Sequence, residues 1–444
     1  MISGSNLNYP KILILGETFR RDTGGGITLK NYFKNWDKKS IIVASKSVEN
    51  VDLSYCNSYY IFGNSEKLIP FIFRNILRYP EKKVLNSEEL QSSKTDFSKT
   101  ENEIKQNRIK KNFLKAVSHF IGIHYLINYI RISNELYTWI KKLNPDVIYF
   151  QPNSFADISF LYRLNKKLKL PVVTHVVDDY RNKDNFSLFR VIVRMQSSKM
   201  IRNIINQSCL NLSICDEMSE EYYKRFNKIF YPFVNPVDFQ LNPVINYSNK
   251  LKKFKIIYAG RITIGNIEAI STYIDVVESL QNDGIDILFD IYSSDFISEI
   301  IKKTQKSQAV FFKGYLEHSK INETLSRYDL LFLPLSFSKK SIKYTRLSLP
   351  TKTSEYMISG VPILIYAPTE TALYRYAARK EWAFLISSAR EIVIKDQIRE
   401  IIQEPEQRKK YAEKAYEIAS TYHNAENKRM AFEQLIFKAL EKTH

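Results

Sequence analysis

The sequence predicts an α/β protein made of two Rossmann-like, doubly wound domains that face a cleft. Two series of short β-branched runs alternate with longer amphipathic segments, and a polar segment that contains prolines separates the two series. Short buried strands joined by helices are typical of βαβ units and parallel sheets. A chain of 444 residues is long enough for two such domains.

The first series of strand-like runs predicts an N-terminal domain over residues 1–240. The runs are residues 11–15, 40–44, 59–62, 147–150, 172–175 and 210–214. Between the third and fourth runs, residues 81–107 are polar and rich in Ser, Lys and Glu. We expect a surface insertion there, because such a composition buries little apolar surface.

The second series predicts a C-terminal domain over residues 250–425. The runs are residues 255–259, 287–291, 310–312, 330–333 and 363–366. The polar segment at 235–250, with Pro236 and Pro243, is expected to link the domains. Residues 426–444 have a helical pattern, and the N-terminal domain is the candidate partner for this helix.

The charge of the chain favours anionic partners. There are 66 Lys and Arg residues against 47 Asp and Glu, a net charge of +19. Nucleic acid, acidic lipid and phosphorylated substrates all fit that charge. No nucleic-acid-binding motif accompanies it, so we do not expect nucleic acid. Three basic stretches contribute, at 105–115, 181–202 and 339–346. The first two fit either contact with an acidic membrane surface or the solvated face of a core helix.

The patterns of cysteine, histidine and hydropathy argue against several other classes of protein. Three cysteines without a CxxC pair exclude a disulfide scaffold and a zinc ribbon, and the six histidines show no metal-ligand spacing. The N-terminus lacks signal-peptide features, and the longest apolar run, 117–130, is too short to span a bilayer. We therefore expect a cytoplasmic protein without a bound metal, with peripheral attachment to the inner face of the cell membrane as an alternative.

Ligands of doubly wound sheets bind beyond the carboxyl ends of the strands. After the first predicted strand come Gly24, Gly25 and Gly26, which allow the backbone to approach a ligand closely. The pattern is not GxGxxG, which disfavours a dinucleotide site. The alternative is a flexible loop that enters a helix.

The strand at 172–175 ends in a second candidate cluster. His175 lies at the strand end, and Asp178 and Asp179 follow it. A histidine there can hydrogen-bond a polar ligand. The alternative for His175 is a capping or buried role.

The C-terminal domain offers a phosphate-binding pattern. Gly260 and Arg261 follow its first strand, and a guanidinium can form two hydrogen bonds with phosphate oxygens. Gly314 follows another strand and permits close approach of a nucleobase.

Residues 349–362 predict a short helix with an anion-binding N-terminus. Lys352, Thr353 and Ser354 lie in its first turn, and Glu355 can accept hydrogen bonds from a vicinal diol. The alternative for Glu355 is simple complementation of the helix dipole.

Six segments together resemble the GT-B glycosyltransferases, specifically the retaining group 1 (family 4-like) enzymes. They are the glycines at 24–26, THVVDD at 174–179, SICDEM at 213–218, NPVD at 235–238, YAGR at 258–261 and PTKTSEYMISGVP at 350–362. The family often carries two glutamates eight positions apart. Glu355 fits the second, whereas Leu347 stands at the first.

The resemblance implies a metal-independent hexosyltransferase that uses a nucleotide sugar held mainly by the C-terminal domain. It implies that Arg261 and Lys352 bind the diphosphate and that Glu355 holds the ribose. His175 and the glycines at 24–26 would face the transferred sugar and the acceptor. The expected donor-binding and catalytic residues are therefore Gly260, Arg261, Gly314, Lys352, Thr353, Ser354, Glu355 and His175. The expected acceptor-facing residues are Gly24, Gly25, Gly26, Asp178 and Asp179.

We expect transfer to a lipid-linked or polysaccharide acceptor, with retention, in surface glycan biosynthesis. Two alternatives stay open at this point. One is a catalytically inactive GT-B-like binding or chaperone subunit of a glycosylation complex, which the residue at Leu347 favours. The other is a nucleotide-sugar epimerase.

Overall fold

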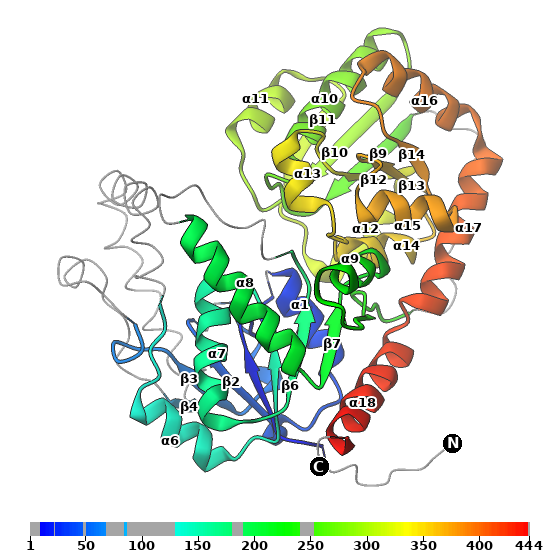
Figure 1. The fold of residues 1–444 in the computed structure, drawn as a ribbon. Helices are drawn as coiled ribbons and strands as arrows, with labels where there is room; N and C mark the ends of the chain where they lie inside the picture. The colour runs from blue at the N-terminus through cyan, green and yellow to red at the C-terminus, as the bar shows by residue number, and fades with distance from the viewer. Residues whose placement is uncertain are drawn as a thin grey trace, which may run out of the picture. The chain divides into compact units, whose positions relative to one another are not determined.

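The computed structural model of the chain describes residues 9–21, 23–47, 50–67, 84–86, 129–179, 190–239 and 253–442. The chain forms two compact units. The first contains Met1–Phe233 and Arg429–His444, and the second contains Val234–Lys428. Each unit is drawn with its sheet and helices in Figure 1.

The first unit holds, within the described residues, one sheet of eight strands in the order β4-β3-β2-β1-β5-β6-β7-β8. All neighbouring pairs are parallel except β3 and β4. The strands are β1 (Ile12–Leu15), β2 (Ile41–Ser45), β3 (Ser58–Ile61), β4 (Val84–Asn86), β5 (Val147–Phe150), β6 (Val172–Val176), β7 (Leu210–Ser213) and β8 (Tyr231–Pro232). The strand order reverses between β1 and β5, which is the switch point where doubly wound sheets bind ligands.

Helices cover this sheet and start at caps that the sequence supplies. The helices are α1 (Gly24–Tyr32), α6 (Asn134–Leu143), α7 (Phe155–Leu168), α8 (Arg190–Gln207), α9 (Asp216–Phe226) and α18 (Ala425–Glu441). Ser133 and Ser154 cap α6 and α7 by accepting hydrogen bonds from backbone N–H groups, and Thr23 caps α1 in the same way.

The C-terminal part of α18 completes the core of the first unit. Phe432 is fully buried there. Its ring centroid lies 4.8 Å from that of Tyr32, 5.3 Å from Phe33 and 5.9 Å from Phe233. Edge-on and tilted aromatic pairs of this kind stabilise a core beyond the area they bury.

The second unit holds, in the stretch 253–428, a sheet of six parallel strands in the order β11-β10-β9-β12-β13-β14. The strands are β9 (Phe254–Ala259), β10 (Ile287–Tyr292), β11 (Val310–Gly314), β12 (Leu330–Pro334), β13 (Ile363–Tyr366) and β14 (Phe384–Ile386). The helices are α10 (Ile267–Asn282), α11 (Ser298–Lys306), α12 (Ile321–Leu325), α13 (Lys339–Thr345), α14 (Lys352–Met357), α15 (Ala372–Lys380), α16 (Glu391–Gln403) and α17 (Pro405–Tyr422).

These two sheets confirm the predicted fold class of two Rossmann-like, doubly wound domains. The sequence reading missed the short strands β4, β8 and β14, which have only two or three residues each. The break between the units falls after Phe233, whereas the N-terminal domain was expected to end at residue 240. Most of the predicted insertion at 81–107, the basic stretch at 105–115 and the segment at 242–250 lie outside the described residues. Among the helices that the structure describes, none is long and apolar enough to cross a membrane.

Replacing Phe432 with alanine should destabilise the first unit by about 3–5 kcal/mol, because the change leaves a cavity among aromatic rings. Urea unfolding followed by tryptophan fluorescence measures this loss, and one of the three tryptophans, Trp36, has its ring centroid 6.5 Å from that of Phe432. Met430→Ala is the control on the same helix, since Met430 is 48% exposed and its loss should change stability by about 0.5 kcal/mol or less. Equal effects of the two changes would contradict this account of the core.

Candidate functional site

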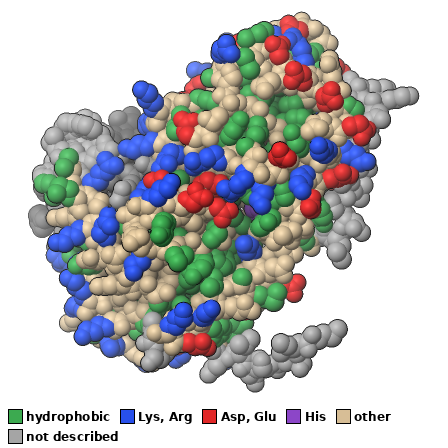
Figure 2. Space-filling model, turned by 45° about the vertical axis from the view of Figure 1, so that its right-hand side comes forward, with side chains coloured by type: hydrophobic (Ala, Val, Ile, Leu, Met, Phe, Trp, Pro, Cys, Tyr) green, Lys and Arg blue, Asp and Glu red, His purple; other side chains and the backbone are tan. Residues whose placement is uncertain are grey.

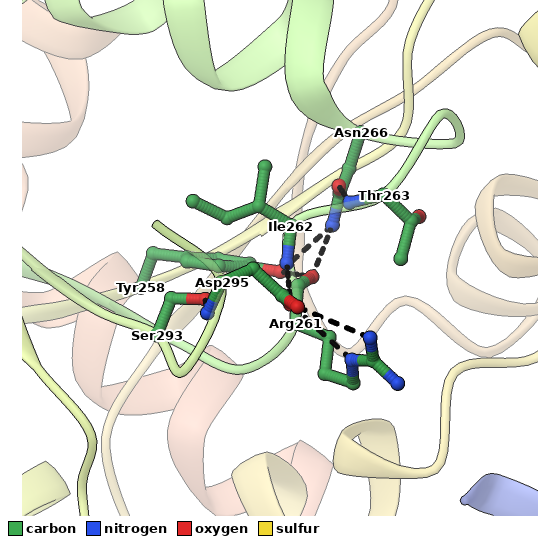
Figure 3. Close-up of polar contacts among 7 residues, drawn as sticks. All are labelled: Tyr258, Arg261, Ile262, Thr263, Asn266, Ser293 and Asp295. Atoms are coloured by element: carbon green, nitrogen blue, oxygen red, sulfur yellow. Dashed lines mark hydrogen bonds and ion pairs between the residues drawn. The ribbon is translucent and has the colours of Figure 1, made fainter. Parts of the chain in front are cut away.

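In the second unit, polar side chains gather where β9 ends. The Tyr258 hydroxyl lies at their centre: it donates to the carbonyl of Arg261 at 2.5 Å and accepts from Asn266 Nδ2 at 2.7 Å. Lys352 Nζ donates to the same hydroxyl at 2.8 Å. Tyr258 is fully buried, and burial raises its pKa well above the ordinary value, so the hydroxyl stays protonated. Figure 3 shows Tyr258, Arg261 and Asn266 converging on this turn.

Lys352 reaches the turn from the start of α14. Its ammonium lies 4.0 Å from the centroid of the Tyr258 ring, a cation–π contact. Gly260 makes room for it: φ of Gly260 is +151°, and a Cβ atom on this residue would lie 2.2 Å from Lys352 Nζ. Burial lowers the pKa of Lys352 to about 7, although nearby Glu355 partly opposes the shift.

Asp295 holds the Arg261 side chain. The Arg261 Nε and Nη2 atoms donate to the two Asp295 carboxylate oxygens at 3.2 and 3.1 Å, and the Ile262 backbone N–H donates to the same carboxylate at 3.0 Å. This fork joins the turn after β9 to the turn after β10 (Figure 3). The Arg261 side chain is 61% exposed and that of Asp295 only 19%, so the carboxylate is the fixed half of the pair.

Glu355 lies one turn below Lys352 on α14 and is partly accessible. Its side chain is 20% exposed, and its Oε1 lies 3.9 Å from Nδ1 of the exposed His318. Burial raises the pKa of Glu355, whereas the neighbouring His318 and Lys352 side chains act in the opposite direction. The second unit thus places the Glu355 carboxylate near Lys352 at the carboxyl end of its sheet, and Arg261 follows β9 at the same end.

The structure assigns other roles to Thr353 and Ser354, which the sequence reading took as donor-binding. Thr353 is fully buried. The Ser354 hydroxyl lies 2.6 Å from the Asn235 carbonyl and 2.7 Å from His423 Nδ1, and His423 Nε2 lies 2.8 Å from the Tyr376 hydroxyl. Burial lowers the pKa of His423 to about 3, so it is neutral. Ser354 therefore connects α14 to the rest of the second unit. Its hydroxyl has a structural role rather than a donor-binding one.

Gly314 ends β11 with φ +74°, and nothing lies within 4 Å of where its Cβ would be. The positive φ at this position favours glycine, and the space beside it is open. Both features fit the close approach of a nucleobase that the sequence predicts. In the third basic stretch, Lys339, Lys340 and Lys343 are exposed on α13.

In the first unit, the glycine loop packs against the ends of β1 and β5. A Cβ on Gly25 would lie 2.8 Å from side-chain oxygens of Gln151 and Glu17, and one on Gly26 would lie 2.4 Å from the Arg20 carbonyl. Gly24 is exposed at the start of α1. Packing therefore explains the absence of a side chain at Gly25 and Gly26, and Gly24 is the most exposed of the three glycines.

His175 lies in the core of the first unit and does not face an open surface. It is fully buried, its Nδ1 is 2.5 Å from the Tyr149 hydroxyl, and its ring contacts that of Tyr32 at 6.2 Å. Burial lowers the pKa of His175 to about 3, so the imidazole is neutral. The buried alternative for this histidine holds, and the prediction of a ligand-facing side chain fails because the strand keeps it inside.

Asp179 is engaged in a buried ion pair rather than exposed to an acceptor. Arg225 donates to its two carboxylate oxygens at 3.1 and 3.0 Å, and the Tyr222 hydroxyl donates at 3.2 Å. The pair fixes α9 to the loop after β6. Asp178 is half-buried in that loop.

Sequence reasoning missed Asn266, Asp295 and His423 and gave no role to Tyr258, which it quoted only as part of the segment 258–261. Asn266 offered a signal, since it stands in the segment before α10 where a side chain can bond to the preceding turn. Asp295 follows β10 and could have been included by the strand-end argument. Among the residues that the structure describes, no group of three or more His, Cys, Asp or Glu side chains could hold a metal ion.

One protein family and several solved structures are similar to this chain. Residues 245–418 match the family model described as glycosyl transferases group 1. Three solved structures are similar along almost the whole chain. HepE from Anabaena, solved with UDP-glucose, is 12% identical with a TM-score of 0.59 and covers 97% of this chain and 100% of its own. Sucrose-phosphate synthase from Thermosynechococcus elongatus is 10% identical with a TM-score of 0.60, over 98% of this chain and 100% of its own.

The third is WaaG, a glycosyltransferase involved in lipopolysaccharide biosynthesis, which is 13% identical with a TM-score of 0.54 over 94% of this chain and 98% of its own. A match to TarM, with a TM-score of 0.47, covers 67% of this chain and 57% of that protein's chain. No curated protein sequence matches this chain.

The fold is that of the GT-B glycosyltransferases. Residues 245–418 of the chain are similar to the group 1 glycosyl transferases. The resemblance inferred from the sequence is confirmed at this level, and the retaining, family 4-like detail stays a prediction.

Gly260→Ala should lower the free energy of unfolding by about 1–3 kcal/mol more than Gly284→Ala. Both glycines have positive φ, at +151° and +86°, but only at Gly260 does a Cβ meet Lys352, whereas nothing lies within 4 Å at Gly284. Chemical denaturation of the two variants isolates the clash from the backbone strain. Equal losses of unfolding free energy in the two variants would mean that Lys352 moves aside without an energetic cost.

Proposed function

We propose that this protein transfers a sugar from a nucleoside-diphosphate sugar to a lipid-linked or polysaccharide acceptor, with retention and without a bound metal, in surface glycan biosynthesis. One observation carries the proposal: Lys352, Arg261 and Glu355 gather at the carboxyl end of a sheet in the segment that matches the group 1 family. The crystal structure of HepE with UDP-glucose supports the donor by analogy, and the involvement of WaaG in lipopolysaccharide biosynthesis supports the pathway.

The roles of the side chains follow from their charges. Lys352 and Arg261 would stabilise the negative charge that builds up on the leaving diphosphate, since fixed cations lower the barrier most where charge develops. Glu355 would accept hydrogen bonds from the ribose hydroxyls, and Gly260 and Gly314 would let the backbone approach the nucleotide. Asp295 would keep the Arg261 fork in place.

In the proposed step, the bond between the anomeric carbon and the diphosphate oxygen breaks while the acceptor oxygen bonds to the same face of that carbon. The proton of the acceptor hydroxyl passes to the leaving diphosphate oxygen. His175 takes no direct part in this scheme, because it is buried and neutral. Gly24 is the residue of the N-terminal glycine loop that we place nearest the acceptor.

The deciding experiment incubates the full-length protein with UDP-, GDP- and dTDP-sugars and glycan or lipid-linked acceptors, and measures nucleoside diphosphate release. We expect turnover with one donor, and Glu355→Ala should reduce kcat/KM about 100-fold or more by removing a substrate contact. Glu391→Ala is the matched control, since Glu391 lies in the first turn of α16 and is exposed.

Each other outcome contradicts the proposal. Failure to bind any nucleotide sugar excludes a donor-dependent transferase. Binding without turnover supports the inactive binding subunit, a reading that the buried Leu347 favours. Isomerised donor in the absence of acceptor supports an epimerase.

Donor affinity should depend on the charge of Lys352. Because the ammonium is the form that attracts a diphosphate, affinity should fall as the pH rises through about 7, the pKa of Lys352. Lys352→Met should weaken binding at pH 6 about tenfold and remove this pH dependence. Calorimetric titration with the nucleotide sugar measures both, and its diphosphate diester does not itself titrate near neutral pH.

The pKa of Lys352 also predicts how stability depends on pH. Stability should rise with pH, whereas donor affinity should fall. The unfolded lysine, with its ordinary pKa of 10.5, binds a proton that the folded one has lost above about pH 7. The wild-type free energy of unfolding should therefore gain a contribution that rises between these two values. Lys352→Met should lack that contribution, and an unchanged profile in the variant would show that Lys352 is not the group responsible.

A further inference from the structure

Helix α14 carries Lys352 and Glu355, yet its own hydrogen bonds do little to hold it in place. It has only six residues, and its N-cap residue Thr351 makes no side-chain hydrogen bond to the helix. A helix this short is not stable by itself, because too few backbone hydrogen bonds offset the cost of ordering its residues. The orientation of Lys352 and Glu355 therefore depends on the contacts of α14 with the rest of the second unit.

Asn235 anchors the first turn of α14 through two hydrogen bonds. Its side-chain amide donates to the backbone carbonyl of Thr351 at 3.4 Å, and its backbone carbonyl accepts from the Ser354 hydroxyl at 2.6 Å. The two contacted residues stand directly before Lys352 and directly before Glu355. The bond to Ser354 is buried, so its loss would leave a polar group unpaired away from water.

His423 extends this anchor from the end of α17. Its Nδ1 lies 2.7 Å from the Ser354 hydroxyl oxygen, and its Nε2 lies 2.8 Å from the Tyr376 hydroxyl. Ser354 donates its only hydroxyl hydrogen to the Asn235 carbonyl, so it must accept from Nδ1–H. A neutral imidazole has one N–H, so Nε2 accepts from Tyr376. The donors therefore all run in one direction, from Tyr376 through His423 to Ser354 and on to the carbonyl.

The two segments that supply these anchors are paired with each other. The Val237 N–H donates to the His423 carbonyl at 2.9 Å, and the Ala425 N–H donates to the Val237 carbonyl at 3.1 Å. His423 is fully buried. Very little histidine surface is visible among the coloured residues on the face drawn in Figure 2. The segment 235–238, to which the proposed function gives no role, is thus part of one anchor shielded from water.

Tyr356 fixes the other end of α14 independently. Its hydroxyl accepts from the Ala259 backbone N–H at 2.8 Å and donates to the Ala259 carbonyl at 3.3 Å. Ala259 is the last residue of β9. Because β9 holds this end of the helix, loss of the anchor at the other end should release mainly the first turn of α14, which carries Lys352 and Glu355.

We propose that Asn235 and His423 are positioning residues for the nucleotide-sugar donor. Acting through Ser354, they hold the first turn of α14 in the orientation in which its charged side chains bind the donor. Neither residue touches the donor in this scheme. Groups that are ordered before the ligand arrives bind it more tightly, because less conformational entropy is lost on binding. The inference rests on the proposed function, in which Lys352 and Glu355 contact the donor.

Two substitutions of His423 test whether its bond to Ser354 matters for donor binding. His423→Leu removes this bond and should weaken donor affinity about tenfold, as measured by calorimetric titration. His423→Asn places an amide N–H close to the position of Nδ1 and should keep most of the affinity. Both variants lose the bond to Tyr376, so that loss cannot explain a difference between them.

A second measurement needs no donor. Lys352 should make the unfolding free energy rise between about pH 7 and its ordinary pKa of 10.5. If the first turn of α14 is released, the ammonium returns to water and its pKa moves back toward the ordinary value. His423→Leu should therefore show a smaller rise than the wild type, whereas His423→Asn should keep it. Chemical denaturation over this pH range measures both.

Thr304→Val is the matched control for the loss of a buried hydroxyl. The Thr304 hydroxyl donates to the Ile301 carbonyl at 3.0 Å on α11, and the residue is 7% exposed. Its replacement should lower stability but leave donor affinity and the pH-dependent rise unchanged. If His423→Leu does not fold, Ser354→Ala takes its place, since it removes only the hydroxyl, and the same results are expected.

Equal donor affinity in the wild type and His423→Leu would overturn the proposal. So would equal losses in His423→Leu and His423→Asn, because the bond to Ser354 would then not matter. Normal donor turnover in His423→Leu would contradict the anchor and leave the transferase assignment intact. A protein that binds no nucleotide sugar, but whose pH-dependent rise is lost in His423→Leu, would contradict glycosyl transfer while supporting the anchor.

Discussion

The hydroxyl of Tyr258 is the contact on which the second unit's site depends. It is a buried group that meets a backbone carbonyl, an amide and an ammonium at once, and each of the three comes from a different stretch of chain. A buried polar network stabilises its surroundings only when all members are satisfied. Here that condition fixes the turn after β9, the start of α10 and the start of α14 with respect to one another.

Burial in this network changes the protonation of Lys352. In water an ammonium is fully charged at neutral pH, but burial against an aromatic ring brings its pKa to about 7. An anionic ligand would return the lysine to its charged form, so protonation and ligand binding would be linked. Gly260 permits this because any side chain there would occupy the position of the ammonium.

The fold could be predicted from the sequence because strand patterns in parallel sheets are local, and runs such as 147–150 and 330–333 are apolar throughout. The positions of Gly260 and Arg261 followed from the rule that ligands bind beyond the carboxyl ends of strands, and that of Lys352 from the N-terminus of a short predicted helix. The direction of individual side chains did not, since His175 and Ser354 look like ligand groups in sequence but are held by neighbours more than 20 residues away. Short strands such as β8 were not predicted, because two residues are too few to show a strand pattern in the sequence.

The C-terminal end of α18 also bears on how the chain is synthesised. The first unit consists mostly of residues made early, yet Phe432 and Ile436 belong to its core. Multidomain chains commonly fold from the N-terminus as they emerge from the ribosome. In this protein the N-terminal unit cannot reach its final packing until the second unit has been translated in full, so its aromatic core stays incomplete throughout translation of the second unit.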